Sequence, residues 1–575
     1  MLLNLWPGNH LGFLYPTVAF LQIHAHRLFE IRQADLAIAV TIHSCPPGAR
    51  FYWIFASSLA PIIPRIGLYG LKYKDLSIIQ CTLEKEVKKM NKRKSKTTAQ
   101  KYINFVEALA IYLLVAYFPL PSSILTIETA VLTASGRVAL GVLFACLFLW
   151  ITEPVPFHIT GFLGVLLMLL LKVDSFATLI KQGFGSETIV FFIGVLTLSA
   201  MITRSGLGKR ISLFVLSLTG NQTAKILLGF LVTGTVLSMW ITELAVAAIL
   251  APLAVSLLND EDMCPMESNF GKALLIACAW GPIIGGIGTP AGAGPNQIAI
   301  GFLRDMAGTE ISFLEWMKYG VPAALLLILP AWWILLKFFP PEKKTLNKSN
   351  QEMKAEFKAM PGLSHDEKST VVIFLITVVL WVLSDPLGSL LGIKIPTAAP
   401  AALCIVLFFL PGVTTFGWRE IEHEISWDSI ILIATGVSLG LSVYNAGAAE
   451  WLALAMLRGI ATMPAVVQII LIILIVSILK VGLSSNTVTA SIIVPIIIAL
   501  ATTYNLPMMG IVIPACLTLA LAFILVTSTP TSIIPYSYGY FTITDMAKPG
   551  TVLTLLSSGI LTLVIYSIGL LSGIY

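Results

Sequence analysis

The segment ILKVGLSSNTVTASIIVP, residues 478–495, places a polar tetrad inside an apolar stretch. The tetrad is Ser484, Ser485, Asn486 and Thr487, and apolar residues flank it on both sides. At mid-membrane depth, polar side chains are tolerated only where protein or a water-filled cavity surrounds them. A hairpin that enters the membrane, turns and leaves on the same side meets that condition. We therefore expect a re-entrant helical hairpin with a polar tip, and a Ser/Thr patch that packs two helices together is the alternative.

The composition places the whole chain in the membrane class. It has 575 residues, of which 57% are hydrophobic and 11% charged, and its mean hydropathy is +0.89. A soluble protein carries about 25% charged residues. The apolar runs predict about ten to twelve membrane crossings. These runs lie at about 102–119, 136–151, 155–172, 187–204, 210–219, 224–240, 271–287, 313–339, 370–384, 396–411, 428–447, 464–483, 506–527 and 550–574.

Lys and Arg gather in two stretches, 85–101 and about 340–368. Basic residues next to spans mark cytoplasmic loops, and no nucleic-acid-binding motif accompanies these two. We therefore expect two cytosolic loops and no nucleic-acid partner. The seven cysteines form no CxxC pair and the seven histidines show no ligand spacing, so we expect neither a metal cluster nor a cofactor.

The first 89 residues differ from the rest of the chain. Their apolar stretches are broken by Pro, Arg and His, fall short of the ~20 residues of a spanning helix, and show no signal-peptide pattern. Met90 opens a basic leader that runs into the first good span. We hypothesise that the natural start is Met90, which an intact-mass measurement showing a native N-terminus at Met1 would refute. The predicted organisation is an atypical N-terminal extension at 1–89, an N-terminal membrane repeat at 90–339, a cytoplasmic linker loop at 340–369 and a C-terminal membrane repeat at 370–575.

An internal repeat relates the two membrane halves. Four anchors recur in the same order at a nearly constant spacing, and they are Pro154 and Pro396, Gly194 and Gly436, Pro252 and Pro495, and Thr289 and Thr529. Repeats of this size in a membrane chain are typical of secondary transporters. An odd number of crossings in each half would make the repeats inverted, so that one central site can open to each side in turn.

The repeat predicts a second tip in the first half, within TVLSMWITELAVAAILAP, residues 235–252. The equivalent positions are Thr242 and Ser485, Glu243 and Asn486, and Leu244 and Thr487. Each half also holds a second interruption. Gly and Pro recur through 281–296 and exclude a continuous helix there, and the equivalent stretch 527–532 is rich in hydroxyls. Unwound backbone in a transporter core frees carbonyl groups to bind a small cation.

Taken together, these patterns resemble the divalent anion:sodium symporter family, whose members carry dicarboxylates, citrate or sulfate. The matching pieces are 150–156 (WITEPVP), 285–289 (GGIGT) with 295–296 (PN), 485–487 (SNT) and 528–530 (STP). The resemblance runs from about residue 102 to 575. It implies an all-α polytopic membrane protein with two inverted repeats, re-entrant helical hairpins and broken helices. It also implies an elevator-type homodimer in the plasma (inner) membrane, with lipid and a small anion as its other partners.

The resemblance also assigns the site residues. It places the substrate anion against Asn486, Thr487, Thr529 and Pro530, with Thr242 and Glu243 at the first tip. It makes Na⁺ the coupling ion, with one site near Ser485, Asn486 and Ser528 and the other near Thr242, Gly288 and Thr289.

The first tip departs from the family pattern. Glu243 and Leu244 replace the expected Asn and Thr, and Lys480 lies in an apolar run five residues before Ser485. A carboxylate beside a dianion is repulsive, which leaves three functional interpretations open. Burial keeps Glu243 protonated and coupling is to protons; or Glu243 pairs with Lys480, a tethered cation replacing one sodium; or Glu243 binds sodium and the substrate carries less negative charge. A Glu243 that only points into a wet vestibule is the non-functional alternative.

The leading functional hypothesis is a secondary active transporter for a di- or tricarboxylate such as succinate, malate or citrate, coupled to sodium. Sulfate or another oxyanion is the nearest rival substrate, and antiport or proton coupling remains open. A channel would need a continuous polar path, whereas polarity here is confined to paired interruptions. HExxH, GxSxG and a paired-aspartate arrangement are lacking, so we do not expect an enzyme.

Overall fold

The structure is a computed structural model, and it describes residues 98–347, 355, 359–483 and 485–574. The predicted extension at 1–89 therefore lies outside the described residues, as do Ser484 and parts of the predicted linker loop. The described chain is helical apart from one short hairpin of strands β1 (Thr126–Ile127) and β2 (Ala130–Val131). The prediction of an all-α membrane protein is confirmed.

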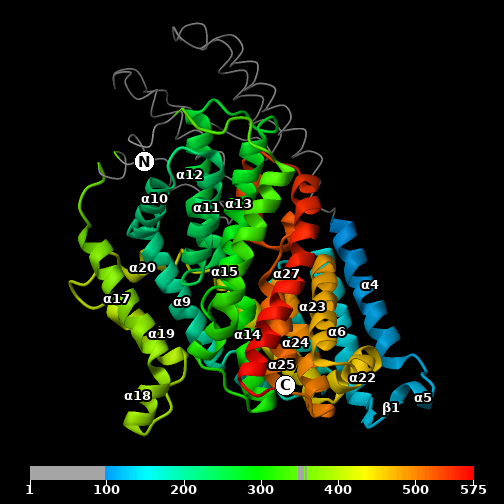
Figure 1. The fold of residues 1–575 in the computed structure, drawn as a ribbon. Coiled ribbons are helices and arrows are strands. Elements are labelled where there is room, and N and C mark those ends of the chain that lie inside the picture. Colours follow the sequence, from blue (N-terminus) through cyan, green and yellow to red (C-terminus); the bar gives the residue numbers. More distant parts are fainter. Residues whose placement is uncertain (1–97, 348–354, 356–358, 484, 575) are drawn as a thin grey trace, which may run out of the picture. The chain divides into compact units, whose positions relative to one another are not determined.

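The helices follow one another in an order that recurs in the two halves (Figure 1). The first half contains α4 (Thr98–Tyr117), α5 (Ser122–Leu125), α6 (Ala134–Thr152), α7 (Phe157–Leu170), α8 (Phe176–Gly183), α9 (Glu187–Arg204), α10 (Leu207–Thr219), α11 (Thr223–Ser238), α12 (Glu243–Asp260), α13 (Asn269–Gly286), α14 (Gly294–Ala307) and α15 (Phe313–Phe338). The second contains α17 (His365–Val382), α18 (Ser384–Leu391), α19 (Ala398–Phe408), α20 (Trp418–Ile421), α21 (Trp427–Asn445), α22 (Ala448–Ala461), α23 (Ala465–Gly482), α24 (Asn486–Thr503), α25 (Met508–Ala520), the 3₁₀ turn η2 (Val526–Ser528), α26 (Pro530–Ser537) and α27 (Ile543–Leu571).

Most predicted runs coincide with helices, and three differences stand out. The list of runs omitted α12 and α24, which begin directly at the polar tips and form the second arms of the two hairpins. It also omitted the 14-residue helices α14 and α22. The run at 506–527 was wrong as one span, because α25 ends at Ala520. The interruption predicted from residue 281 is shorter than expected, because α13 stays helical through Pro282 to Gly286.

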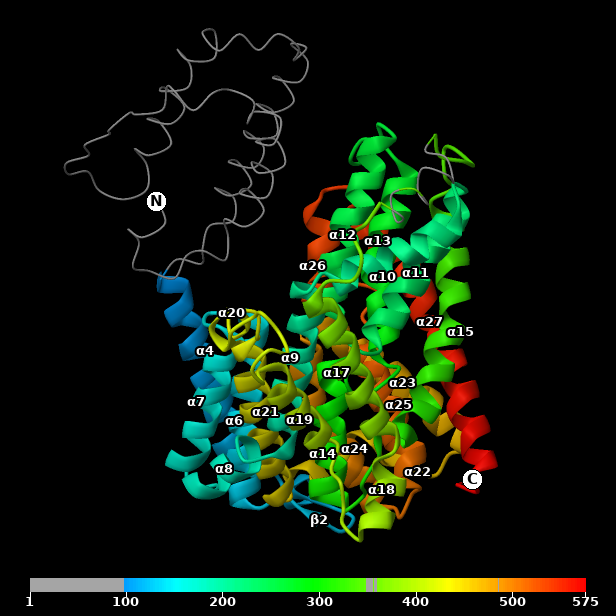
Figure 2. The same ribbon diagram turned by 90° about the vertical axis from the view of Figure 1, so that its left-hand side faces the viewer.

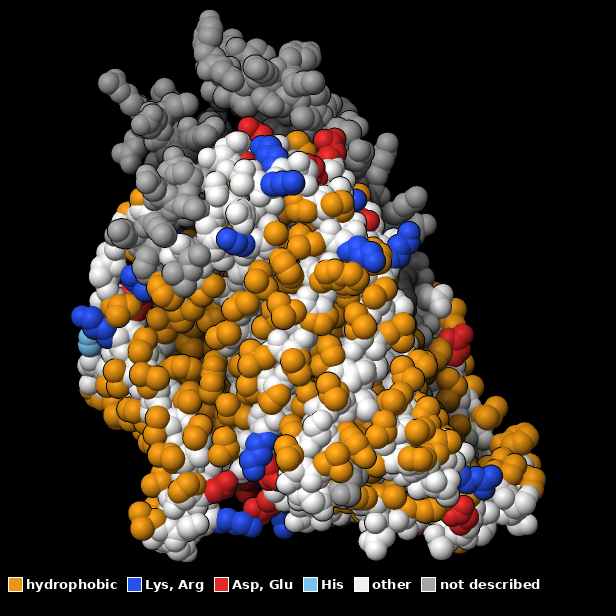
Figure 3. Space-filling view, viewed as in Figure 1, with side chains coloured by type: hydrophobic (Ala, Val, Ile, Leu, Met, Phe, Trp, Pro, Cys, Tyr) orange, Lys and Arg blue, Asp and Glu red, His pale blue; other side chains and the backbone are white. Residues whose placement is uncertain are grey.

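Nine helices in the described part of the chain are long and apolar enough to cross a membrane, or up to ten if the bent pair α17 and α18 is one span. Four shorter apolar helices, α7, α11, α19 and α25, accompany them. Figure 3 shows hydrophobic side chains spread over the middle of one face, with Lys, Arg, Asp and Glu mainly toward its two ends. A lipid-facing surface needs this distribution. The chain is therefore an integral, multi-pass membrane protein.

The two halves pack reciprocally. Helix α7 of the first half lies against α21 of the second, and α19 of the second lies against α9 of the first. The hairpin arms repeat the exchange, since α12 packs on α26 while α24 packs on α14. Such mutual pairing is what a two-fold relation between repeats produces. Figures 1 and 2 place α11 to α13 toward one end of the bundle and α22 to α25 toward the other, as inverted repeats require.

Glycines allow these reciprocal helix pairs to come close. A Cβ atom added to Gly161 of α7 would overlap Thr435 of α21. A Cβ atom added to Gly194 of α9 would lie 2.6 Å from the backbone oxygen of Ala401 in α19. A backbone atom cannot move aside as a flexible side chain can. The packing of α9 against α19 therefore requires glycine at position 194, which is one of the anchors of the sequence repeat.

We expect Gly194→Ala to lower the melting temperature of the purified protein in detergent, because overpacking a tight contact costs about 1–3 kcal/mol. Gly559→Ala in α27 is the matched control, since nothing lies within 4 Å of a Cβ atom there. Alanine is the better helix former by ~1 kcal/mol, so the control should be neutral or stabilising. Equal melting temperatures for the two variants would contradict the close approach of α9 and α19.

Candidate functional site

The first tip is the turn between α11 and α12. Helix α11 ends at Ser238 and α12 begins at Glu243, with Thr242 as its N-cap residue. The Thr242 hydroxyl is hydrogen-bonded to that of Ser199 in α9 at 3.2 Å. Glu243 is only 8% exposed, and its place in the first helical turn lets the helix dipole stabilise a carboxylate. The first tip therefore holds a buried acid on a rigid helix start.

The first interruption joins α13 to α14 and is held closed by side chains. The Asn296 side-chain amide donates to the Gly286 and Thr289 carbonyl oxygens, both at 2.8 Å. Gln297 donates to the Pro290 carbonyl at 3.1 Å. These bonds satisfy carbonyl groups that the interruption would otherwise leave without partners.

The first tip and the first interruption form one polar cluster, which we call the first-half cluster: Ser238, Glu243, Gly286, Thr289 and Asn296. The Thr289 hydroxyl donates to the Met239 carbonyl of the tip. A Cβ atom on Gly286 would overlap the Glu243 carboxylate, so the start of α12 and the end of α13 lie in close contact here. The predicted partnership of Thr242 with Gly288 and Thr289 stays a prediction, because the Thr289 hydroxyl binds Met239 whereas the Thr242 hydroxyl binds Ser199.

Two buried polar atoms of the first-half cluster, Ser238 Oγ and Asn296 Oδ1, have no hydrogen-bond partner among the described residues. Buried polar atoms without partners call for a physical explanation, and an ion is one. Neutral oxygens beside a carboxylate are donors that suit a small hard cation. No group of three or more His, Cys, Asp or Glu in the described part of the chain could hold a metal ion. The cluster therefore fits sodium better than a transition metal.

The second tip joins α23 to α24. Ser485 is the N-cap, and its hydroxyl oxygen accepts from the Val488 amide at 3.4 Å. Asn486 and Thr487 open α24 and are half-buried. The Asn486 side chain has no hydrogen-bond partner within the described ranges and is free to bind a ligand. Thr487 Oγ1 would lie 3.5 Å from a Cβ atom on Gly294, so the second tip faces the start of α14 in the other half.

The second interruption leads from α25 through η2 into α26, where Thr529 is the N-cap and Pro530 the first helical residue. The Thr529 hydroxyl donates to the Thr531 hydroxyl at 3.2 Å. The Thr531 hydroxyl donates in turn to Glu243 Oε2 at 3.3 Å. This chain of two hydrogen bonds connects the second interruption to the first tip. Buried Ser528 precedes Thr529, and Ser532 Oγ is another buried atom without a partner among the described residues.

Lys480 does not bond to Glu243. It is 4% exposed in the last turn of α23, and its Nζ donates to the Thr518 carbonyl at 2.9 Å. The direct ion pair between Glu243 and Lys480 that one interpretation expected is therefore not formed in this structure.

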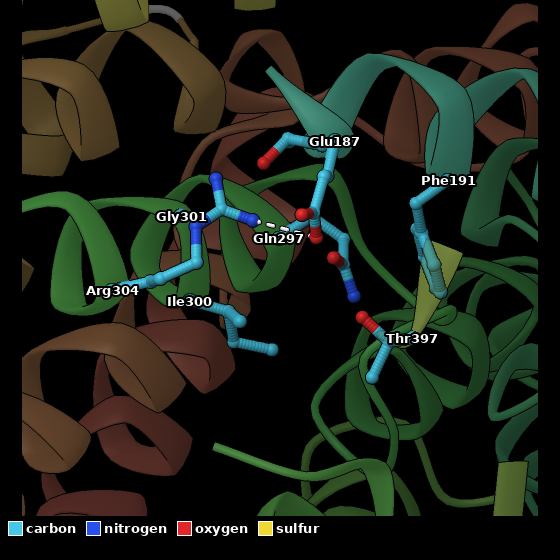
Figure 4. A pocket seen from close by; sticks show the side chains of 8 residues that line it. Glu187, Phe191, Gln297, Ile300, Gly301, Arg304 and Thr397 are labelled. Atoms are coloured by element: carbon cyan, nitrogen blue, oxygen red, sulfur yellow. Dashed lines mark hydrogen bonds and ion pairs between the residues drawn. The ribbon is translucent and has the colours of Figure 1, made fainter. Parts of the chain in front are cut away.

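A small cleft lies along α14, between it and α9 (Figure 4). It encloses about 210 Å³, including its open mouth, and is lined by Glu187, Thr188, Phe191, Gln297, Ile300, Gly301, Arg304 and Thr397. Arg304 pairs with Glu187 at 2.9 Å and with its neighbour Asp305 at 2.7 Å. The cleft thus holds an ion pair between α14 and α9, and its Gln297 also binds the Pro290 carbonyl of the first interruption.

The structure thus brings together Glu243 with the 529–531 segment, and Thr487 with the start of α14. It leaves Lys480 apart from Glu243. Sequence reasoning missed Thr531, Ser238, Asn296 as a bridging residue, and the pair Arg304 and Glu187. Asn296 could have been found, because it lies in the quoted Pro-Asn motif. The other contacts join residues far apart in the chain, and no local pattern signals them.

Two hairpins whose polar tips meet two interrupted helices define a class: a secondary membrane transporter of the inverted-repeat type. Comparison with known proteins names the family. The family profile "Sodium:sulfate symporter transmembrane region" matches residues 99–572, and the chain belongs to this family. The resemblance drawn from the motifs is confirmed.

Curated relatives include the sodium-dependent dicarboxylate transporters SdcS of Staphylococcus saprophyticus and Staphylococcus aureus. Each is 28% identical to this chain, over 437 and 438 residues; the alignments cover 72% and 73% of this chain and 83% of the relative. Among solved structures, the YdaH transporter of Alcanivorax borkumensis has a TM-score of 0.50 at 14% identity, covering 68% of this chain and 88% of that one. At that identity the likeness concerns the fold alone.

We expect Asn296→Ala to destabilise the protein by about 1–3 kcal/mol, because two hydrogen bonds worth about 0.5–1.5 kcal/mol each are lost. Gln297→Ala is the matched control, since that buried amide makes one such bond. Thermal unfolding in detergent should show the larger drop in melting temperature for Asn296→Ala. A larger drop for Gln297→Ala would contradict the bridging role of Asn296.

Proposed function

We propose that the chain is a secondary active transporter that moves a small divalent anion across the membrane by sodium-coupled alternating access. A dicarboxylate such as succinate or malate, or the tricarboxylate citrate, is the favoured substrate class. The observation that carries the proposal is the crossed arrangement of the site. The first tip touches the second interruption through Glu243 and Thr531, and the second tip faces the first interruption through Thr487 and Gly294.

The proposed anion site uses two helix starts. Helices α24 and α26 begin at Asn486 and Pro530, so their first N–H groups and dipoles favour an anion. The Asn486 amide and the Thr487 and Thr529 hydroxyls add neutral hydrogen-bond donors, which suit carboxylate oxygens. The proposal adds Thr242 and Glu243 from the first tip, because Glu243 accepts a hydrogen bond from Thr531 beside the start of α26. Glu243 then selects against a second carboxylate unless a cation lies between them.

The proposed cation sites lie at the interruptions. The first-half cluster offers the Glu243 carboxylate, unpartnered Ser238 and Asn296 oxygens, and the carbonyl-rich backbone of 286–293, close to the predicted Thr242, Gly288 and Thr289. In the second half, Ser485, Asn486 and buried Ser528 are the predicted counterparts. Sodium, when bound, would neutralise the repulsion between Glu243 and an incoming anion.

The names of the curated relatives support sodium coupling and a dicarboxylate. The family description supports sulfate as the second candidate, since a neutral hydroxyl and amide site binds either dianion. Exchange and proton coupling are the alternatives to sodium symport that Glu243 raises. The proposal has three further parts. The hairpins move past a fixed scaffold as in an elevator-type transporter, the protein forms a homodimer, and it resides in the plasma membrane.

Uptake by proteoliposomes containing the full chain tests the proposal. We expect labelled succinate, citrate or sulfate to accumulate when a sodium gradient points inward, and not when potassium replaces sodium. Varying the proton gradient and loading unlabelled substrate inside distinguish proton coupling and exchange. Uptake of none of the three anions would refute the substrate class.

We expect Glu243→Gln to raise the sodium concentration for half-maximal uptake about tenfold or more, because removing a ligand charge worth ~1.4 kcal/mol changes an affinity tenfold. The substitution keeps the size and a hydrogen-bond acceptor for Thr531. Glu187→Gln, which removes the partner of Arg304 in the cleft along α14, is the matched control and should leave the sodium dependence unaltered. An unaltered sodium dependence in Glu243→Gln itself would remove this carboxylate from coupling.

A further inference from the structure

We propose that the Lys480 ammonium is a built-in cation that takes the place of one coupling sodium in the second half, so that one mobile sodium accompanies each dianion. This inference rests on the proposed function, and it specifies the coupling at the same site.

The position of Lys480 is one that a cation would occupy without the side chain. Its Nζ binds the carbonyl of Thr518 in the last turn of α25, which ends two residues later at Ala520. Helix α23 also ends nearby, at Gly482. The C-terminal ends of helices carry partial negative charge and carbonyls with spare acceptor capacity. In transporters with interrupted helices, such ends coordinate the coupling cation.

The equivalent position in the first half carries no cationic side chain. The repeat aligns Lys480 with Leu237, an apolar residue at the end of α11. The adjacent first-half cluster holds the Glu243 carboxylate and two buried oxygens without partners among the described residues. The first half therefore has oxygen ligands for a cation but no cationic side chain beside them. The second half has the Lys480 ammonium as a cation that is part of the chain.

The inventory of buried charges supports this division. Among the described residues, the buried charged side chains are Glu243, Glu261, Glu367 and Lys480. Glu261 pairs with Lys343, and Glu367 pairs with Arg210. Glu243 and Lys480 remain, one in each hairpin, and neither is in an ion pair. A buried charge is costly unless an opposite charge or dipole compensates it. Lys480 has the Thr518 carbonyl dipole, whereas no Lys or Arg among the described residues forms an ion pair with Glu243.

The net charge moved per cycle follows from this division. Glu243 and Lys480 belong to the protein and return in every cycle, so only the substrate and the mobile sodium carry net charge across. One sodium with one dianion moves one net negative charge inward. An inside-negative potential should then oppose uptake, whereas two sodium ions per dianion would make uptake insensitive to the potential.

The test measures the sodium-to-substrate ratio of the full chain in proteoliposomes. Opposing gradients of sodium and of the dianion that is taken up, succinate or sulfate, are varied until net flux is zero. The expected ratio for the natural chain is one, and an inside-negative potential set with potassium and valinomycin should slow uptake. A ratio of two or more, or uptake insensitive to the potential, would overturn the inference while leaving the proposed function intact.

Variants sharpen the result without being needed for it. Lys480→Gln should raise the ratio toward two and abolish sensitivity to the potential, because a free sodium then replaces the ammonium. Lys480→Arg should keep a ratio of one. Lys337→Gln, in which a lysine over the Trp333 ring is changed instead, is the matched control and should also keep it. An unchanged ratio in Lys480→Gln would overturn the inference, and anion uptake that no sodium gradient drives would overturn both it and the proposed function.

Discussion

The absence of water in the bilayer core is the constraint on which this structure depends. Every N–H and C=O group freed by an interrupted helix must find a partner inside the protein. In the first half the Asn296 amide meets this demand by bridging Gly286 and Thr289. In the second half the Thr529 hydroxyl accepts the Thr531 amide and begins the chain of hydroxyls that ends at Glu243. The same groups that permit an interruption therefore also build the site.

The crossed packing of the halves explains why the site is shared. Helix α12 packs on α26, and α24 packs on α14, so each hairpin lies against the interrupted helix of the other repeat. A rearrangement of one hairpin therefore changes the surroundings of both. Tight glycine contacts such as Gly194 against Ala401 leave few intermediate arrangements. Closely packed interfaces of this kind favour two discrete states over continuous deformation.

Sequence reasoning reached the fold because its signals are local. Apolar runs mark spans, and polar or Gly- and Pro-rich stretches mark where a continuous helix is interrupted. The four repeat anchors gave the correspondence between halves. The partners of the site residues could not be reached in this way. Thr531 and Glu243 are 288 positions apart, and Lys480 binds a backbone carbonyl 38 positions away. No local sequence pattern predicts either contact.

The two halves are equivalent in fold but not in charge, and this difference has energetic consequences. If both tips carried the same neutral groups, exchanging the conformations of the repeats would give two states of nearly equal energy. Under the proposed alternating access, Glu243 and Lys480 remove that equivalence, because a charge present at only one tip meets different neighbours in the two states. Burying an ion costs several kcal/mol, depending on its surroundings, and 1.4 kcal/mol already shifts a population tenfold. The charge asymmetry of the tips can therefore set both the resting orientation of the transporter and the number of ions that must bind before it moves.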